Sequence, residues 1–437
     1  MKVSYLVEIE DPHLHLVKVT LKGKRSTGTA QLDVFLPSWS PGSYLMREYS
    51  RHVRWVRATQ DNGEVLWVEQ TAKGTWRLDW DRSQLKAPAD GFSFTYQIYL
   101  HELTVRTSHV DATHAFLHGP SYLVGVVGEP LPAPTIEFRF PPLWSHLSTS
   151  LTEAVAGARD SFVYTAANYD ELVDCPVEIG CHETDGFMAG GVPHALAFYG
   201  EVYPHGNNLK KDFQTIVETV AATMGGTYPF DHYQFITHFA PKLYGGLEHL
   251  NSTALHFDGR RLGVRKDYLT FLSLTAHEYF HAWNVKRIRP KELGPFDYRN
   301  EAYTTLLWLA EGLTSFMDDL FVYRAGLATL EEYLDFVKGN LDTFLATPGR
   351  RFHSLEDSSY NAWIKLYRPD ENLRNSSVSY YLKGGLVFMA LHADLQAKGK
   401  GIDDLLALLW QDYQSRPAIG VTKEQVYGMV ESLGGAA

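Results

Sequence analysis

Two histidines four residues apart, with a glutamate directly after the first, stand in "TAHEYFHAWNVKRIRP" (275–290). On a helix, His277 and His281 lie one turn apart on one face, so both imidazoles can reach one zinc ion. Glu278 projects to the side, where it can touch a water on the metal. The alternative is a core helix that holds histidine by chance, since the chain contains 19 histidines. Ring nitrogens buried without a shared partner would be unsatisfied, which favours the metal.

A catalytic zinc needs a third protein ligand and one position left open for water. Downstream candidates are Glu292, in a loop flanked by prolines, Glu301, which resembles an acid in the first turn of a helix, and Glu311. Glu311 lies among apolar residues in "LWLAEGLTSF" (307–316), and an ionised carboxylate there needs a cation. We therefore expect Glu311 to be the third ligand. Asp318 is either an acceptor that orients a ligand histidine or a solvated surface acid.

The helix that carries the histidines is predicted over residues 267–286. Its apolar residues recur at helical spacing, and Asp267 is a suitable N-cap. Lys286 and Arg287 stand where a helix C-terminus favours cations, and Pro290 ends the segment.

Composition limits the classes of function. The chain has 437 residues with 45% hydrophobic and 21% charged residues, enough for two or three domains with their own cores. A formal net charge of −11 argues against nucleic-acid binding, and the basic patches at 260–266 and 285–289 are interpreted as solvated faces or helix ends. No apolar run or leader pattern is present, so we expect a soluble, cytoplasmic protein without membrane association. Cys175 and Cys181 are interpreted as small core thiols rather than a disulfide framework.

The first half of the chain has the pattern of strands. Segments at 2–10, 14–23, 29–37, 91–103 and 135–141 are short and rich in Val, Phe, Tyr and Thr, with turn residues between them. Later segments predict a helix near 208–224, a strand at 232–240 and mostly helix from 267 onward. We expect an N-terminal β domain over 1–172 and a catalytic domain over 173–437.

Three segments in this order resemble the glycyl aminopeptidase family of zinc metallopeptidases, relatives of the larger aminopeptidases with a thermolysin-like catalytic domain. They are "YGGLEHLNST" (244–253), "HEYFHAWNVKRIRP" (277–290) and "LWLAEGLTSF". In the N-terminal half, "LPSWSPGSYLMREYSRH" (36–52) and "NYDELVDCPVEIG" (168–180) are similar to that family's β domain. The resemblance implies an α+β chain with an N-terminal β-sandwich-like domain followed by a mainly helical thermolysin-like domain.

The resemblance also implies roles for individual residues. His277, His281 and Glu311 match the zinc ligands, and Glu278 matches the general base.

The resemblance further implies a substrate-binding edge strand, in which Gly245 and Gly246 let a peptide backbone approach and Glu248 faces the free α-amine. Glu248 could instead be an ordinary strand acid beside a bulge. Tyr381 in "SYYLKGG" (379–385) matches a tyrosine that donates to the transition state. Because adjacent helix residues point about 100° apart, at most one of Tyr380 and Tyr381 faces a given site.

The expected function is a zinc-dependent aminopeptidase acting on peptides, with Gly or Ala favoured at the substrate N-terminus. The alternatives are a zinc endopeptidase, a hydrolase of a non-peptide bond, and a scaffold or binding protein that retains zinc. Family members usually continue into a PDZ domain, whereas this sequence ends at "ESLGGAA", either as a shortened form or cut in that region. The oligomeric state is not readable from the sequence.

Overall fold

The segments with strand composition in the first half form strands in the computed structural model, which describes residues 1–154, 162–201 and 206–434. Burial alternates along β1 (Val3–Glu8), as a sheet with one buried face requires. The other predicted segments form β2 (Leu16–Lys24), β3 (Gln31–Phe35), β7 (Gly91–Tyr99) and β11 (Thr135–Arg139). The strand prediction for these five segments is confirmed.

All five strands belong to the larger of two sheets in this part of the chain. The larger sheet has the order β10 (Gly125–Val126), β3, β6 (Thr75–Asp79), β5 (Val65–Ala72), β4 (Val53–Gln60), β7, β2, β1, β11, β14 (Val163–Thr165), β13 (Thr152–Glu153). The smaller has the order β12 (His146–Thr149), β15 (Val177–Gly180), β9 (His114–Leu117), β8 (His109–Val110). A short helix, α1 (Tyr169–Val173), follows β14.

A third sheet is formed by strands between residues 183 and 257. Its order is β16 (Glu183–Ala189), β17 (Val192–Gly200), β18 (Tyr233–Phe239), β20 (Ser252–Phe257), β19 (Tyr244–Glu248). Strands β17, β18 and β20 run parallel, and β19 pairs antiparallel with β20 at the edge. Every residue of β18 and β20 is buried, as expected for parallel strands.

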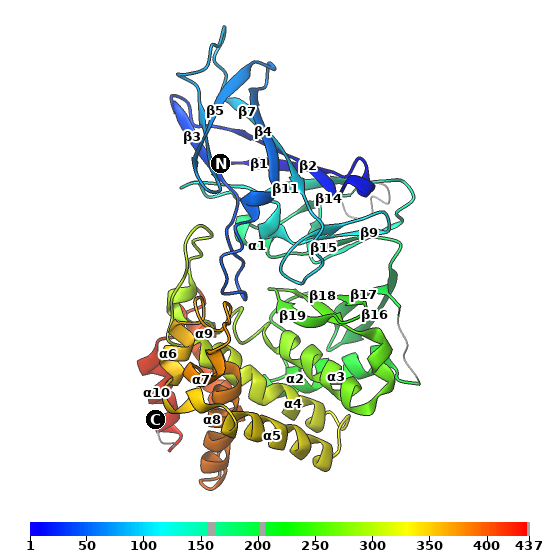
Figure 1. The fold of residues 1–437 in the computed structure, drawn as a ribbon, viewed down its shortest axis with the longest axis vertical. Helices are drawn as coiled ribbons and strands as arrows, with labels where there is room; N and C mark the ends of the chain where they lie inside the picture. Colours follow the sequence, from blue (N-terminus) through cyan, green and yellow to red (C-terminus); the bar gives the residue numbers. More distant parts are fainter. Residues whose placement is uncertain (155–161, 202–205, 435–437) are drawn as a thin grey trace. The chain divides into compact units, whose positions relative to one another are not determined.

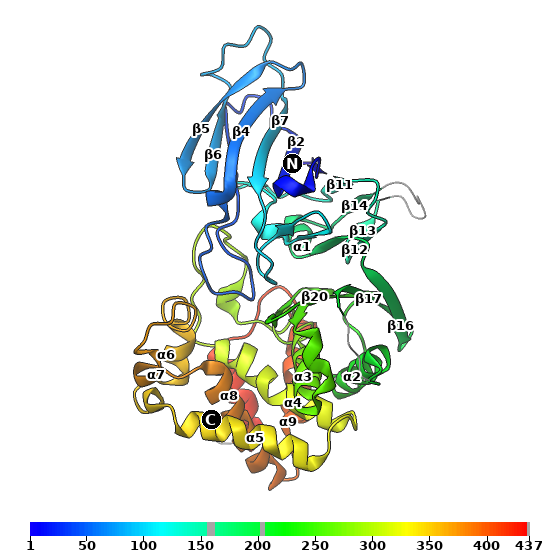
Figure 2. The same ribbon diagram turned by 45° about the vertical axis from the view of Figure 1, so that its right-hand side comes forward.

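The remaining chain is mainly helical, as predicted. Figures 1 and 2 show α2 and α3 beneath the third sheet, with α4 packed on α3 and α8 on α4. The helices are α2 (Leu209–Thr223), α3 (Arg265–Phe280), α4 (Leu313–Arg324), α5 (Leu330–Leu345), α6 (Leu355–Tyr360), α7 (Leu373–Ser376), α8 (Tyr380–Gln396), α9 (Ile402–Ser415) and α10 (Lys423–Ser432). Within the described residues, each helix is too short or too polar to span a bilayer.

The chain folds into two compact units. The first is Met1–Glu183 with the short segment Tyr298–Asn300, and the second is Thr184–Asp297 with the chain from Glu301 onward. The α+β class, with a large β region first and a helical region after it, is confirmed.

The helix with the two histidines differs from its prediction at both ends. It begins at Arg265, with Val264 at the N-cap and no side-chain cap. Asp267 instead accepts hydrogen bonds from the guanidinium of Arg261 at 2.5 and 3.0 Å. The helix ends at Phe280, because the amides of Ala282 and Trp283 donate to carbonyl oxygens three rather than four residues earlier.

Two further interpretations of charged or polar residues were wrong. Arg287 is buried rather than solvated, because its guanidinium donates to the carbonyl oxygens of Leu250, Ala282 and Pro229 at 2.7–3.0 Å. Cys181 is exposed rather than in the core, and it is a free thiol.

Candidate metal centre and active site

Helix α3 brings three chemically active side chains to one place. His277 and His281 lie one turn apart with ring centroids 4.7 Å from each other. His281 and Glu278 are buried, with exposed fractions of 1% and 5%. His277 lies in the last turn of α3 and His281 is its C-cap residue, so the structure places the two histidines side by side.

Glu311 reaches this site from a local irregularity in the chain. Residues Trp308–Gly312 form a π-helical turn, η6, directly before α4. Such turns redirect side chains and expose carbonyl oxygens that need donors. The buried amide of Asn284 supplies them, donating to the carbonyls of Leu309 and Ala310 at 3.1 and 3.0 Å. No role was predicted for Asn284; its position three residues after His281 was the available signal.

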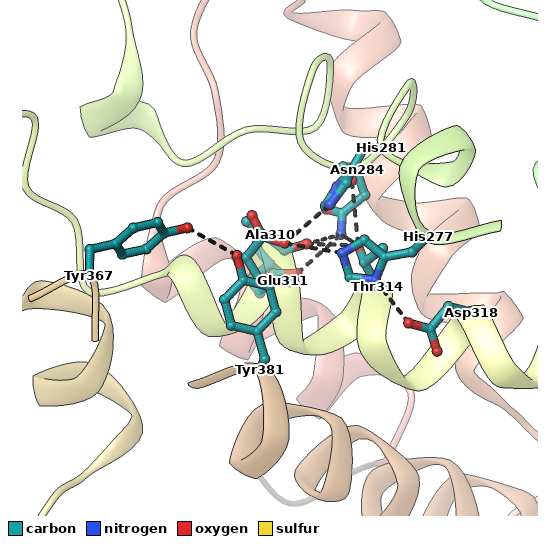
Figure 3. A network of polar contacts seen from close by, with 10 residues as sticks. His277, His281, Asn284, Ala310, Glu311, Thr314, Asp318, Tyr367 and Tyr381 are labelled. Atoms are coloured by element: carbon teal, nitrogen blue, oxygen red, sulfur yellow. Dashed lines mark hydrogen bonds and ion pairs between the residues drawn. The ribbon is translucent and has the colours of Figure 1, made fainter. Parts of the chain in front are cut away.

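The ligand atoms meet at distances that suit a metal ion. Glu311 Oε2 lies 3.4 Å from His277 Nε2 and 3.1 Å from His281 Nε2 (Figure 3). His277 donates its Nδ1 proton to Asp318 Oδ2 at 2.9 Å, and His281 donates its own to the Asn284 carbonyl at 2.5 Å. In the neutral form of each ring, Nε2 is thereby left as the lone-pair nitrogen. Two imidazoles and one carboxylate are a donor set that fits catalytic zinc.

Burial and neighbouring charges shift the pKa values of Glu311 and His277 in opposite directions. Burial raises the pKa of Glu311, but His281 and His277 outweigh it and bring the pKa down to about 2. Burial lowers the pKa of His277, while Asp318 and Glu311 raise it well above its usual value. A metal ion that uses Nε2 of His277 must displace a proton, so metal affinity should increase with pH.

Glu278 faces the edge strand β19 rather than the ligand set. Burial raises its pKa to about 7, although the nearby histidines oppose this. A Cβ on Gly246 would lie 2.1 Å from Glu278 Oε1, so only glycine leaves the carboxylate its place. The preceding Gly245 has φ of 151°, a conformation that side chains rarely adopt.

Glu248, at the end of β19, is the third buried acid of the site. Its exposed fraction is 3%, and its Oε1 has no hydrogen-bond partner among the described residues. Single ligand atoms of Glu248, Glu278 and His281 lie within 4.8 Å of one another. The structure thus brings together the metal candidates, the predicted base and the predicted amine-binding acid.

The two tyrosines at the start of α8 are placed differently. Tyr381 stacks toward the metal cluster, with its ring centroid 6.3 Å from that of His277, whereas Tyr380 is fully buried. The Tyr381 hydroxyl lies 3.3 Å from the hydroxyl of Tyr367, a neighbour that was not predicted from the sequence (Figure 3). Burial raises the pKa of Tyr381 well above its usual value, so it remains a proton donor.

Helix α8 and the π turn touch through glycines. A Cβ on Gly312 would lie 2.7 Å from the Cα of Gly384, and a Cβ on Gly384 would lie 2.9 Å from the Cα of Gly312. Glu311 directly precedes Gly312, and Tyr381 lies about one helical turn before Gly384. The close approach of the two glycines therefore limits how far the backbone of Tyr381 can lie from that of Glu311.

The other two candidate ligands lie outside the cluster. Glu292 accepts a hydrogen bond from the Thr304 hydroxyl at 3.0 Å, and exposed Glu301 accepts one from Tyr303 at 2.8 Å. Glu301 is not in the first turn of a helix, because the side chain of Thr304 caps the amide of Leu306 and helical structure begins only after it.

Known proteins share both halves of this architecture. The M61 glycyl aminopeptidase family matches residues 270–387, and the M61 N-terminal domain matches residues 4–181. The crystal structure of an aminopeptidase N family protein from Idiomarina loihiensis is 31% identical with a TM-score of 0.92, covering 100% of this chain and 74% of that one. No curated protein sequence matches the chain.

More distant structures share the fold. An M1 zinc metallopeptidase from Deinococcus radiodurans is 13% identical with a TM-score of 0.58, covering 99% of this chain and 90% of its own. A mutant of the Deinococcus enzyme bound to the substrate Tyr-Ser-Ala is 14% identical with a TM-score of 0.59, covering 100% and 91%. With family matches in both halves and a 31% identical relative that covers the whole of this chain, the chain belongs to the M61 glycyl aminopeptidase family of zinc peptidases.

Proposed function

We propose that this peptidase is an aminopeptidase, which hydrolyses the first peptide bond of peptides with a free N-terminus. The observation that carries the proposal is the buried carboxylate of Glu248, whose Oε1 has no partner among the described residues. A buried charge needs a cation or several hydrogen-bond donors. The α-ammonium group of a substrate supplies both.

The position of Glu248 supports cleavage at the first bond. Its ligand atom lies within 4.8 Å of those of Glu278 and His281. An α-amine bound there leaves room for only one residue before the scissile carbonyl, which then lies beside the base. An endopeptidase would need space for further residues on that side.

His277, His281 and Glu311 would hold the zinc ion. When bound, zinc acts as a Lewis acid toward the scissile carbonyl and makes water a stronger nucleophile near neutral pH. Asp318 and the Asn284 carbonyl hold the two histidines in the required tautomer through their Nδ1 protons.

Glu278 is proposed as the general base. Its carboxylate takes a proton from the attacking water and delivers it to the departing amine. A pKa raised toward 7 by burial suits a group that must both accept and release a proton near neutral pH. The Tyr381 hydroxyl would donate a hydrogen bond to the oxyanion of the tetrahedral intermediate.

The edge strand β19 is proposed to hold the substrate backbone. An edge strand offers amide and carbonyl groups that an extended peptide can pair with. Gly245 and Gly246 keep this edge free of side chains, so a peptide can approach closely. A preference for Gly or Ala as the first residue is proposed from the family's description alone.

The test compares a free and an N-acetylated peptide of the same sequence on wild type and Glu248→Gln. A charge-assisted hydrogen bond is worth about 1.5–3 kcal/mol, so acetylation should cost wild type roughly ten- to a hundredfold in kcat/KM. In Glu248→Gln the preference for the free peptide should largely disappear, because acetylation of the peptide and the substitution of Glu248 remove the same interaction. Glu292→Gln is the matched control and should keep the full preference.

Two outcomes would refute the proposal. Equal cleavage of free and acetylated peptides by wild type would favour an endopeptidase. Zinc binding without hydrolysis of any peptide or aminoacyl arylamide, in a panel that includes Gly and Ala, would favour a scaffold that retains its metal site.

A further inference from the structure

A second set of metal-binding side chains lies in the N-terminal unit, on the hairpin formed by β8 and β9. The hairpin contains "HVDATH" (109–114). His109 stands opposite Phe116, and the Asp111 amide donates to the His114 carbonyl at 3.0 Å. Opposite residues of an antiparallel pair share a face, as do residues two apart. The register therefore puts His109, Asp111 and His114 on one face, and a ligand atom of each lies within 4.8 Å of the others.

His114 is oriented in the same way as a metal ligand. Its Nδ1 donates to Glu178 Oε1 at 2.7 Å, on the adjacent strand β15. This hydrogen bond fixes the tautomer in which Nε2 carries the lone pair. The pair repeats the arrangement of His277 and Asp318 at the catalytic site, and such carboxylate–histidine pairs accompany ligated imidazoles in metal sites.

Asp111 is held as an anion. Its Oδ1 accepts the amide and hydroxyl protons of Thr113 at 2.7 and 2.6 Å and the His114 amide proton at 3.2 Å. Oδ2 then faces His109 Nε2 at 3.1 Å. Bonds of about 2.0–2.1 Å to a tetrahedral zinc put ligand atoms about 3.4 Å apart, so this spacing is close to what an ion requires.

The acidic groups of the hairpin also point to a cation. Two acids lie at the hairpin, Glu178, which is fully buried, and Asp111. The side chain of Asp111 is 31% exposed, which leaves a path from solvent. His109 is 8% exposed, and its Nδ1 has no hydrogen-bond partner among the described residues. The exposed ring of His101 stacks on it at 4.8 Å.

We propose that His109, Asp111 and His114 bind a second divalent transition-metal ion, separate from the catalytic zinc. Two imidazoles and a carboxylate match zinc best, with cobalt as a spectroscopic substitute. The ion would balance buried Glu178 and partly exposed Asp111 and tie the β8–β9 turn to the sheet. All three residues belong to the N-terminal unit, so this second site does not depend on the aminopeptidase activity.

The test counts metal ions in the full chain. Metal-free protein is reloaded with Zn²⁺, desalted and analysed for zinc. Wild type should hold two ions per chain, Asp111→Asn one, Glu311→Ala one, and the double variant none. Asn keeps the hydrogen bonds of the turn, because its amide oxygen accepts the same protons. His101→Gln is the matched control and should still hold two.

Thermal unfolding of Glu311→Ala gives a second readout. For the 437-residue chain, zinc at a hundredfold excess over Kd should raise Tm by about 3 °C, and Asp111→Asn in this background should remove that increase. One zinc per wild-type chain, or the same zinc content and Tm shift with and without Asp111→Asn, would overturn the proposal. Loss of zinc from Asp111→Asn but not from Glu311→Ala would support this second site while contradicting the catalytic ligand assignment.

Discussion

Adding a single methyl group at Gly246 should disable Glu278, the proposed general base, without emptying the proposed metal site. A Cβ there would lie 2.1, 2.3 and 2.4 Å from Oε1, Cδ and Cγ of Glu278, where ordinary contact begins at 3.4 Å. The carboxylate must therefore retreat by about 1 Å. A misplacement of about 1 Å can cost about a hundredfold in rate, or about 2.7 kcal/mol of transition-state stabilisation. We expect Gly246→Ala to lose about that much kcat/KM and to retain its zinc.

The assay is hydrolysis of an aminoacyl arylamide, with zinc measured on the same samples. Gly339→Ala in α5 is the matched control, because its Cβ meets no atom within 4 Å. Since Gly246 also borders the proposed peptide path, the Glu278→Gln background separates the two effects. There, Gly246→Ala should cost little further rate, because the base is already lost. If the two losses multiply in the double variant, or if Gly246→Ala alone keeps near wild-type activity, the reasoning is refuted.

Three further changes probe other parts of the site. Tyr381→Phe should lower kcat about a hundredfold with little change in KM, while Tyr380→Phe should not; equal losses in steady-state kinetics would contradict the assignment. Glu311→Ala should lose zinc and Glu301→Ala keep it, and metal analysis with the reverse result would exclude Glu311. Burial raises the pKa of Asp319 to about 7, so only the folded state binds its proton between about pH 4 and 7, and stability should fall as pH rises through that window. Asp319→Asn should flatten this slope, and urea unfolding at pH 5 and pH 8 that shows an unchanged slope would contradict it.

Short-range patterns accounted for most of what the sequence could predict. The spacing of His277 and His281 depends only on helix geometry, and the apolar surroundings of Glu311 are visible in the chain itself. Period-two strands and the helical second half are likewise local signals. The family resemblance then supplied the predicted roles of Glu248 and Tyr381, which spacing alone did not show.

Features that depend on tertiary packing were not predictable from the same patterns. The π turn at Glu311 exists together with the buried amide of Asn284, which is 26 residues away from Ala310 in sequence. The set on the β8–β9 hairpin required strand register, because residues 109, 111 and 114 share no helical or simple alternating spacing. Arg287 looked like a helix-end cation, and only the structure shows the three carbonyls that it satisfies.

The contact between Gly312 and Gly384 has a consequence for how the site can change. Where two helices meet through side chains, rotamers adjust and the spacing can drift with temperature or with a neighbouring substitution. Here the main chains themselves meet, so nothing between them can be compressed or reoriented. The spacing between the backbone segments that carry Glu311 and Tyr381 is then set by a main-chain contact. Variants selected for new substrates should accordingly accumulate changes around β19 and spare this pair of glycines.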